Sequence, residues 1–276
     1  MVVGLAGFSM EDVEEEAPAP EQRSRAGAIA VAAWGLVIFA GTRAIELVLE
    51  SQSMATAVGQ AVLAEWGGSR LDVTWSDPAT PSDSVPAAIA RRIAIGMAYG
   101  FAAAGVLYVI LRATGAIVVH AVHDVSISLL LVGLATAALH AMRDEILLHG
   151  IALRALRDVD NGVVKALACG ITSAGAALGE PNANVRSIVA HALFGVALGA
   201  LWVEDRGAWR PWAAHAAFLF ATGPLLRGGV VDARIVTSTW TGAESGILGG
   251  IAAVVALAPF AVAALGRLAR KHKAST

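Results

Sequence analysis

An aliphatic run leads directly into a cluster of ionisable residues in the stretch LLLVGLATAALHAMRDEILLHG, residues 129–150. Ionisable side chains are costly inside a bilayer unless they are paired or hydrated, so such a cluster marks a candidate functional site. In a helix, positions four apart lie on the same face. His140 therefore lies over Asp144, and Glu145 lies over His149. The spacing predicts two adjacent carboxylates that each have an imidazole within reach.

The whole chain has the composition of a membrane protein. Of its 276 residues, 57% are hydrophobic and only 15% are charged, whereas about 25% are charged in an ordinary soluble domain. The formal net charge of -2 leaves no surplus of positive charge to neutralise a nucleic-acid backbone. These values favour an integral membrane protein and argue against a nucleic-acid partner.

Apolar runs that approach the length of a membrane span, about 20 residues, recur along the chain. They cover residues 26–49, 86–111, 126–141, 162–179, 187–203, 211–226 and 245–265. The more polar segment 142–158 is helical by pattern, so the chain crosses the bilayer seven or eight times. The sequence therefore predicts an all-α fold, a polytopic integral membrane bundle of seven or eight transmembrane helices.

The segments that flank these runs are polar. Residues 1–24 are acidic and contain two prolines, a composition typical of a disordered tail, and we interpret residues 25–273 as one transmembrane domain. Residues 51–85 are expected to form a polar loop with an interfacial stretch. Four Lys or Arg residues within 267–273 favour a cytoplasmic C-terminus. The excess of Arg over Lys favours a bacterial protein, hence the bacterial cytoplasmic (inner) membrane.

Two further ionisable residues stand at the ends or starts of apolar runs. Glu180 ends a run of small residues just before a proline, and His215 lies one turn into a run that begins at Pro211, a favoured first position of a helix. Each also has a simpler interpretation: Glu180 as a loop carboxylate and His215 as a packed core residue. Gly195 and Gly199 are four apart, which predicts close packing of two helices.

Taken in order, these stretches resemble the CPBP family of glutamic-type intramembrane proteases, which includes the type II CAAX prenyl endopeptidases. That family has a Glu-Glu-x-x-x-Arg motif followed by Gly, then Phe-x-x-x-His, a Gly-x-x-x-Gly helix, and His-x-x-x-Asn. In this chain DEILLHG (144–150) takes the first place, and GVALG (195–199) leads to His215. The motif-bearing core spans residues 140–226.

The chain departs from the family motifs at four positions. Asp144 replaces the first glutamate, His149 the arginine, Glu180 the histidine of the second motif and Leu219 the asparagine of the third. Leu219 offers no hydrogen bond, and the loss of one oxyanion donor slows catalysis by about 100-fold to 1000-fold.

The resemblance implies a catalytic set in which acids and imidazoles act on water. It comprises Asp144, Glu145, His149, Glu180 and His215. Asp144 would be the general base, with Glu145 supporting or replacing it. His215 would donate to the oxyanion or shuttle a proton, and Glu180 could donate only in a protonated form that a desolvated carboxyl group can adopt.

Three functions remain open at this point. The first is an intramembrane endopeptidase that cleaves membrane-anchored or lipidated proteins, in C-terminal processing or protein sorting. The second is a catalytically inactive relative that acts as a membrane scaffold or binds substrates. The third is a proton-coupled transporter, which is disfavoured because the sequence shows no inverted repeat.

We expect no cofactor and no protein-bound metal. A His-Glu-x-x-His motif is absent, so a zincin-type site is unsupported, and the single cysteine, Cys169, excludes a cysteine-based zinc site. The expected partners are membrane lipids and a membrane-anchored protein or peptide substrate, while the sequence leaves the oligomeric state open.

Overall fold

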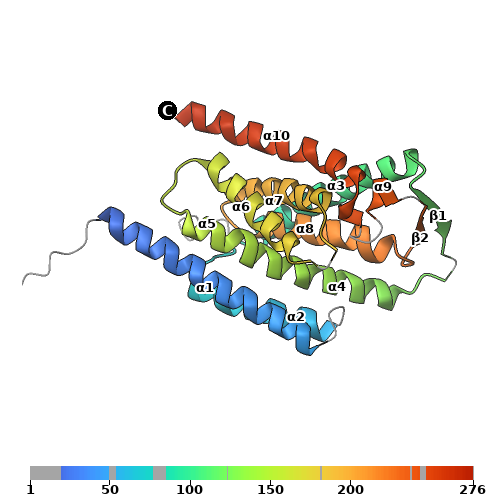
Figure 1. The fold of residues 1–276 in the computed structure, drawn as a ribbon, viewed down its shortest axis with the longest axis horizontal. Helices are drawn as coiled ribbons and strands as arrows, with labels where there is room; N and C mark the ends of the chain where they lie inside the picture. The colour runs from blue at the N-terminus through green and yellow to red at the C-terminus, as the bar shows by residue number, and fades with distance from the viewer. Residues whose placement is uncertain are drawn as a thin grey trace, which may run out of the picture.

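The helices of the computed structural model lie side by side, mostly along its longest axis (Figure 1). The structure describes residues 20–49, 54–76, 85–122, 124–180, 182–236, 238–242 and 247–275. The long helices are α1 (Pro20–Val48), α2 (Met54–Arg70), α3 (Pro86–Ala113), α4 (Ile127–Asp144), α6 (Gly162–Leu178), α7 (Val185–Asp205), α8 (Trp209–Phe220) and α10 (Ile251–Ser275). Shorter elements are the π-helical turns η2 (Glu145–Gly150) and η3 (Ala221–Leu225), α5 (Ile151–Ala155), α9 (Ser238–Thr241) and the 3-10 turn η4 (Ile247–Gly249). The predicted all-α class is confirmed.

One small sheet accompanies the helices at the end of the molecule where α3 ends. Strand β1 (Ile117–Ala121) pairs with β2 (Val231–Ile235) in antiparallel register, with Val119 opposite Ala233. The sequence analysis predicted no strand. The two strands join the segment that precedes α4 to the segment that follows η3.

Five helices in the described part of the chain are long and apolar enough to cross a bilayer. They cover Gly27–Val48, Pro86–Ala113, Ile127–Ala155, Val185–Asp205 and Ile251–Ala274. Large apolar side chains on these helices point outward, among them Ile29, Leu129 and Val262, each at least 68% exposed. An outward apolar surface of this kind is stable in lipid and unstable in water, so the chain is an integral membrane protein.

The candidate cluster lies in one continuous helix. The sequence analysis placed a span at 126–141 and a separate polar helix at 142–158, but α4, η2 and α5 follow one another without a break over 127–155. Turn η2 contains Glu145 and His149. Single π-helical turns inside α-helices occur often at functional sites. In this one, the ionisable residues Glu145 and His149 are buried inside the bundle.

The expected polar loop at 51–85 is wrong for residues 54–70, which form α2. Its inward face carries small residues together with Gln60, which is fully buried. The amide of Gln60 donates to the Thr42 carbonyl on α1 (3.0 Å) and accepts from Arg143 on α4 (2.7 Å). These bonds satisfy the hydrogen-bonding groups of a buried polar residue. Because Gln60 is polar, the sequence analysis assigned this segment to a loop. Residues 77–84 lie outside the described part.

The N-terminal boundary also differs from the expectation. Helix α1 begins at Pro20 and so includes residues 20–24 of the predicted acidic tail. Residues 1–19 of that tail lie outside the described residues. At the C-terminal end of the chain, α10 extends to Ser275 and includes the cationic residues of 267–273. These side chains therefore lie on a helix.

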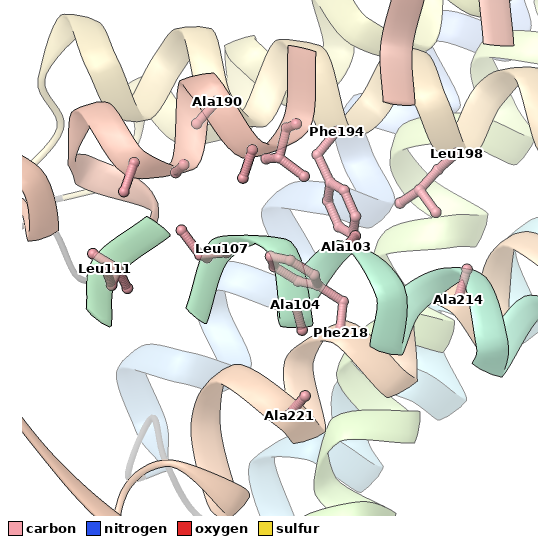
Figure 2. Packing of buried hydrophobic residues seen from close by; sticks show 14 of the residues in the cluster. Ala103, Ala104, Leu107, Leu111, Ala190, Phe194, Leu198, Ala214, Phe218 and Ala221 are labelled. Atoms are coloured by element: carbon pink, nitrogen blue, oxygen red, sulfur yellow. The ribbon is translucent and has the colours of Figure 1, made fainter. Parts of the chain in front are cut away.

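The largest hydrophobic core lies between α3, α7, α8 and α10 (Figure 2). Phe218 on α8 is fully buried, and its ring lies 4.6 Å from that of Phe194 on α7. Leu107 on α3 belongs to the same cluster. Alanines supply many of the remaining members, so the helices approach closely around a few large side chains. This core holds α8, and with it His215, in place.

Small residues allow the closest helix contacts. A methyl group at Gly195 or Gly199 on α7 would collide with Ser173 or Cys169 on α6. The packing predicted for the two glycines is therefore observed. Cys169 itself is fully buried in this interface.

Gly100→Ala on α3 is expected to lower the stability of the protein by about 2 kcal/mol, because the added methyl group would overlap the backbone carbonyl of Ala214 on α8. Thermal unfolding in detergent measures the effect. Gly105 on the same helix has open space at its Cβ position. Gly105→Ala should therefore leave the unfolding temperature unchanged or raise it slightly, and equal losses for both variants would contradict this account.

Candidate active site

The carboxylate of Glu145 is the centre of the candidate site. The residue is fully buried at the start of η2. Its Oε2 accepts hydrogen bonds from His149 Nδ1 (2.9 Å) and Trp202 Nε1 (3.0 Å), and its Oε1 accepts from His215 Nδ1 (2.9 Å). Three N–H donors stabilise an ionised carboxylate, which has no hydrogen of its own to donate. The predicted pairing of Glu145 with His149 is observed.

These donors come from three different parts of the chain. His149 is the next-to-last residue of the π-helical turn, Trp202 lies near the end of α7, and His215 lies in the second turn of α8. Each imidazole binds Glu145 through Nδ1, so its Nε2 is directed elsewhere. Nε2 of His149 lies 3.0 Å from the hydroxyl of Ser173 on α6. The carboxylate thus orients two imidazoles at once.

A cavity of about 680 Å³ opens beside this cluster. One part of its wall is polar and contains Asp144, His149, Ser173, Glu180, His191 and His215. Another part is apolar and contains Leu129, Leu130, Val132, Leu219 and Pro224. The cavity therefore follows α4 from Leu129 to Asp144, a distance of about 22 Å at 1.5 Å per residue.

Asp144 lies at the cavity wall, whereas Glu145 does not line the cavity. The Asp144 side chain is 22% exposed and accepts a hydrogen bond from Arg143 Nε (2.7 Å). A second nitrogen of Arg143 donates to Gln60 on α2 (2.7 Å), which fixes the guanidinium. His140 and His215 line the same cavity as Asp144, but the hydrogen-bond partner of Asp144 is Arg143 and not the expected His140.

Glu180 reaches the same cavity from beyond the end of α6. Its Oε1 lies 3.8 Å from Nε2 of His191 on α7. The Nδ1 of His191 donates to the carbonyl of Ser187 (2.8 Å), so the imidazole is held with Nε2 toward the carboxylate. The structure thus places an imidazole beside the acid that stands in the histidine slot of the second motif.

All five residues predicted for the site meet around one cavity, with Glu145 directly behind the wall. Their catalytic roles remain predictions. The sequence analysis did not select Ser173, Trp202 or His191 for the site. One signal was available: Ser173 precedes Glu180 by seven residues, a spacing of two helical turns in a continuous helix, although α6 ends at Leu178, before Glu180. Trp202 had no such signal, because its partner is 57 positions away.

Among the described residues, no group of three or more His, Cys, Asp and Glu side chains is arranged to hold a metal ion. The imidazole nitrogens nearest to Glu145 are engaged in hydrogen bonds with it. The polar cluster is therefore organised around a carboxylate.

A comparison with known families finds a match over the part of the chain that contains this site. Residues 126–221 match the family model of Rce1-like type II CAAX prenyl endopeptidases. The resemblance to the CPBP proteases is confirmed over this segment. The Rce1-like segment runs from the start of α4 to the end of α8, and so includes every residue predicted for the site. No curated protein and no solved structure matches the chain at a significant level.

Proposed function

We propose that this protein is an intramembrane endopeptidase that hydrolyses a peptide bond in a membrane-anchored or lipidated protein. The observation that carries the proposal is the position of the polar cluster. Within the Rce1-like segment, ionisable residues from α4, α7 and α8 converge beside a cavity in an apolar bundle. Ionisable residues inside an apolar membrane bundle mark a candidate functional site.

The shape of the cavity supports a substrate with an apolar segment. The aliphatic wall along α4 can bind a lipid chain or an apolar stretch of polypeptide, since apolar surface is removed from water or lipid headgroups there. The polar wall would then face the adjoining peptide group. In the chemistry that the resemblance implies, Asp144 deprotonates the attacking water, and His215 stabilises the oxyanion through Nε2 in the protonated form of its ring, since Nδ1 donates to Glu145.

We propose that the chain crosses the bilayer eight times, within the predicted range of seven or eight. The start of α1 and the end of α10 lie at the same end of the bundle (Figure 1), which requires an even number of crossings. The elements would be α1, α2, α3, α4 with η2 and α5, α6, α7, α8 with η3, and α10. Helices shorter than a full membrane span can lie within the bundle, because neighbouring helices shield the backbone groups at their ends from lipid.

The same end of the bundle is rich in cations, which supports a cytoplasmic C-terminus; we propose the bacterial inner membrane as the membrane concerned, from the excess of Arg over Lys. Arg154, Arg157, Lys165 and Arg206 line one cavity of about 400 Å³ there. Leu268 near the end of α10 lies close to Gly162, at the start of α6, so the cations of 267–273 belong to this end. Lys and Arg near the ends of spans favour the cytoplasmic side.

Removal of both acids tests the proposed function. We expect cells with the wild-type protein to contain shortened C-termini of particular membrane proteins, and cells with Asp144→Ala and Glu145→Ala together, or with a deletion, to lack them. Proteomic comparison of membrane-protein C-termini measures this. Arg270→Gln with Lys271→Gln is the control, because both side chains are exposed at the far end of α10.

Two results would contradict the proposal. If the double acid variant processes the same proteins as the wild type while deletion abolishes processing, the chain is a scaffold for a separate protease. If the deletion changes no C-terminus, while the purified chain exchanges protons across liposomes, the transporter hypothesis replaces the endopeptidase.

A further inference from the structure

Ser173, His149 and Glu145 form an unbroken chain of hydrogen bonds. The Ser173 hydroxyl lies 3.0 Å from His149 Nε2, and His149 Nδ1 lies 2.9 Å from Glu145 Oε2. The serine comes from α6, and the other two residues come from η2. A hydroxyl, an imidazole and a carboxylate in this order, with both distances in hydrogen-bond range, have the arrangement by which a serine is activated as a nucleophile.

The surroundings of Glu145 determine where the protons lie. An ionised carboxylate can only accept, so the hydrogen between Glu145 and His149 is on Nδ1 of the imidazole. In neutral His149 the other nitrogen, Nε2, then carries the lone pair. The Ser173 hydroxyl therefore donates to Nε2. This is the tautomer in which an imidazole can remove the proton from a serine hydroxyl.

The hydroxyl and the imidazole reach the cavity, whereas the carboxylate is enclosed. Ser173 and His149 both line the 680 Å³ cavity, and Glu145 lies behind them with no exposed surface. Gly195 on α7 makes room for the serine, because a methyl group there would collide with the Ser173 side chain. Thr172, the preceding residue on α6, donates its hydroxyl to the carbonyls of Leu148 and Cys169 and so has no base.

We infer that Ser173 is a nucleophile, with His149 as its general base and Glu145 as the group that orients the base. The inference rests on the proposed function and names the group that attacks. Oγ of Ser173 forms a bond to the scissile carbonyl carbon while its proton moves to His149 Nε2. The carbon–nitrogen bond then breaks, and His149 returns that proton to the leaving amine. Water hydrolyses the resulting serine ester through the same proton transfers in reverse order.

This step differs from the water attack that the resemblance implies. In that mechanism Asp144 is the base and no covalent intermediate forms. Asp144 hydrogen-bonds to Arg143 and not to Ser173 or His149. The two mechanisms therefore differ at Ser173, which forms a covalent bond to the substrate in one of them and none in the other.

The test is covalent labelling of the full-length protein in liposomes with a fluorophosphonate, which reacts with activated serines. We expect mass spectrometry to find the adduct on Ser173. Ser173→Ala should abolish labelling and lower cleavage by more than about 1000-fold. Thr172→Ala, which removes the adjacent hydroxyl, should retain labelling. Unfolding temperatures show which variants are folded.

Failure of this inference can be told apart from failure of the proposed function. If the wild-type protein carries no adduct on Ser173, and Asp144→Asn abolishes the C-terminal shortening seen in cells, the nucleophile is overturned and the endopeptidase stands. If Ser173 is labelled but deletion changes no C-terminus, the nucleophile stands and the proposed substrate class fails. Equal labelling of wild type and Ser173→Ala also overturns the inference.

Discussion

Glu145→Gln is expected to lower the unfolding temperature of the detergent-solubilised protein by roughly 5 °C and to reduce cleavage more than about 100-fold. The amide has nearly the same volume as the carboxylate, so packing is preserved. It replaces one acceptor oxygen by a donor and removes the negative charge to which His149, Trp202 and His215 donate. At least one N–H group then lacks a partner in the interior, at a cost of about 3 kcal/mol.

Asp144→Asn is the matched control for stability. It removes a neighbouring carboxylate whose side chain is 22% exposed and whose partner Arg143 also bonds to Gln60. The exposed part of this pair is solvated, so we expect a loss below about 1 kcal/mol. Calorimetry or fluorescence of the purified proteins measures both variants. Equal unfolding temperatures for the two variants would contradict the central role assigned to Glu145.

His215→Ala is expected to reduce cleavage by about 100-fold to 1000-fold, whichever group attacks the substrate. The imidazole is the part of the third motif that this chain retains, and it connects Glu145 to the cavity. Its ring also packs edge-on against Phe194 at 5.1 Å. The loss of stability should be smaller than for Glu145→Gln, because His149 and Trp202 still donate to the carboxylate.

Single-turnover cleavage of a substrate identified from the C-terminal comparison measures this effect. His140→Ala provides the control, since it removes another imidazole from the same cavity wall. His140 lines this cavity together with Arg143, Asp144 and Glu46. We expect its rate to fall far less than that of His215→Ala. Equal losses for the two variants would mean that the bond between His215 and Glu145 has no special importance.

Local spacing predicted part of the site correctly. The bond between Glu145 and His149 follows from a separation of four residues on one helix, and the π-helical turn does not break it. The expected pairing of His140 with Asp144 was not observed as a hydrogen bond, because Arg143 is adjacent and is itself held by Gln60. Spacing identifies neighbours, but it does not rank competing partners.

The expected loop at 51–85 shows why one helix was not found. Helix α2 contains Gln60 and many small residues. Its apolar character is therefore too low for a membrane span to be predicted from the sequence. In the folded protein α2 packs against α1 and α4, and Gln60 hydrogen-bonds to both. A polar residue with two partners is stable inside a bundle, and neither partner is close to it in sequence.

The sequence by itself determined that the chain is an integral membrane protein, because the free energy of burying apolar side chains depends on composition and is summed along each run. It also determined which acids and imidazoles are near one another on a single helix. Only the tertiary structure decided that Ser173, Trp202 and His215, from α6, α7 and α8, meet at Glu145 or His149. Those contacts depend on how helices pack at small residues such as Gly195, and packing between distant segments leaves no periodic signal in the sequence.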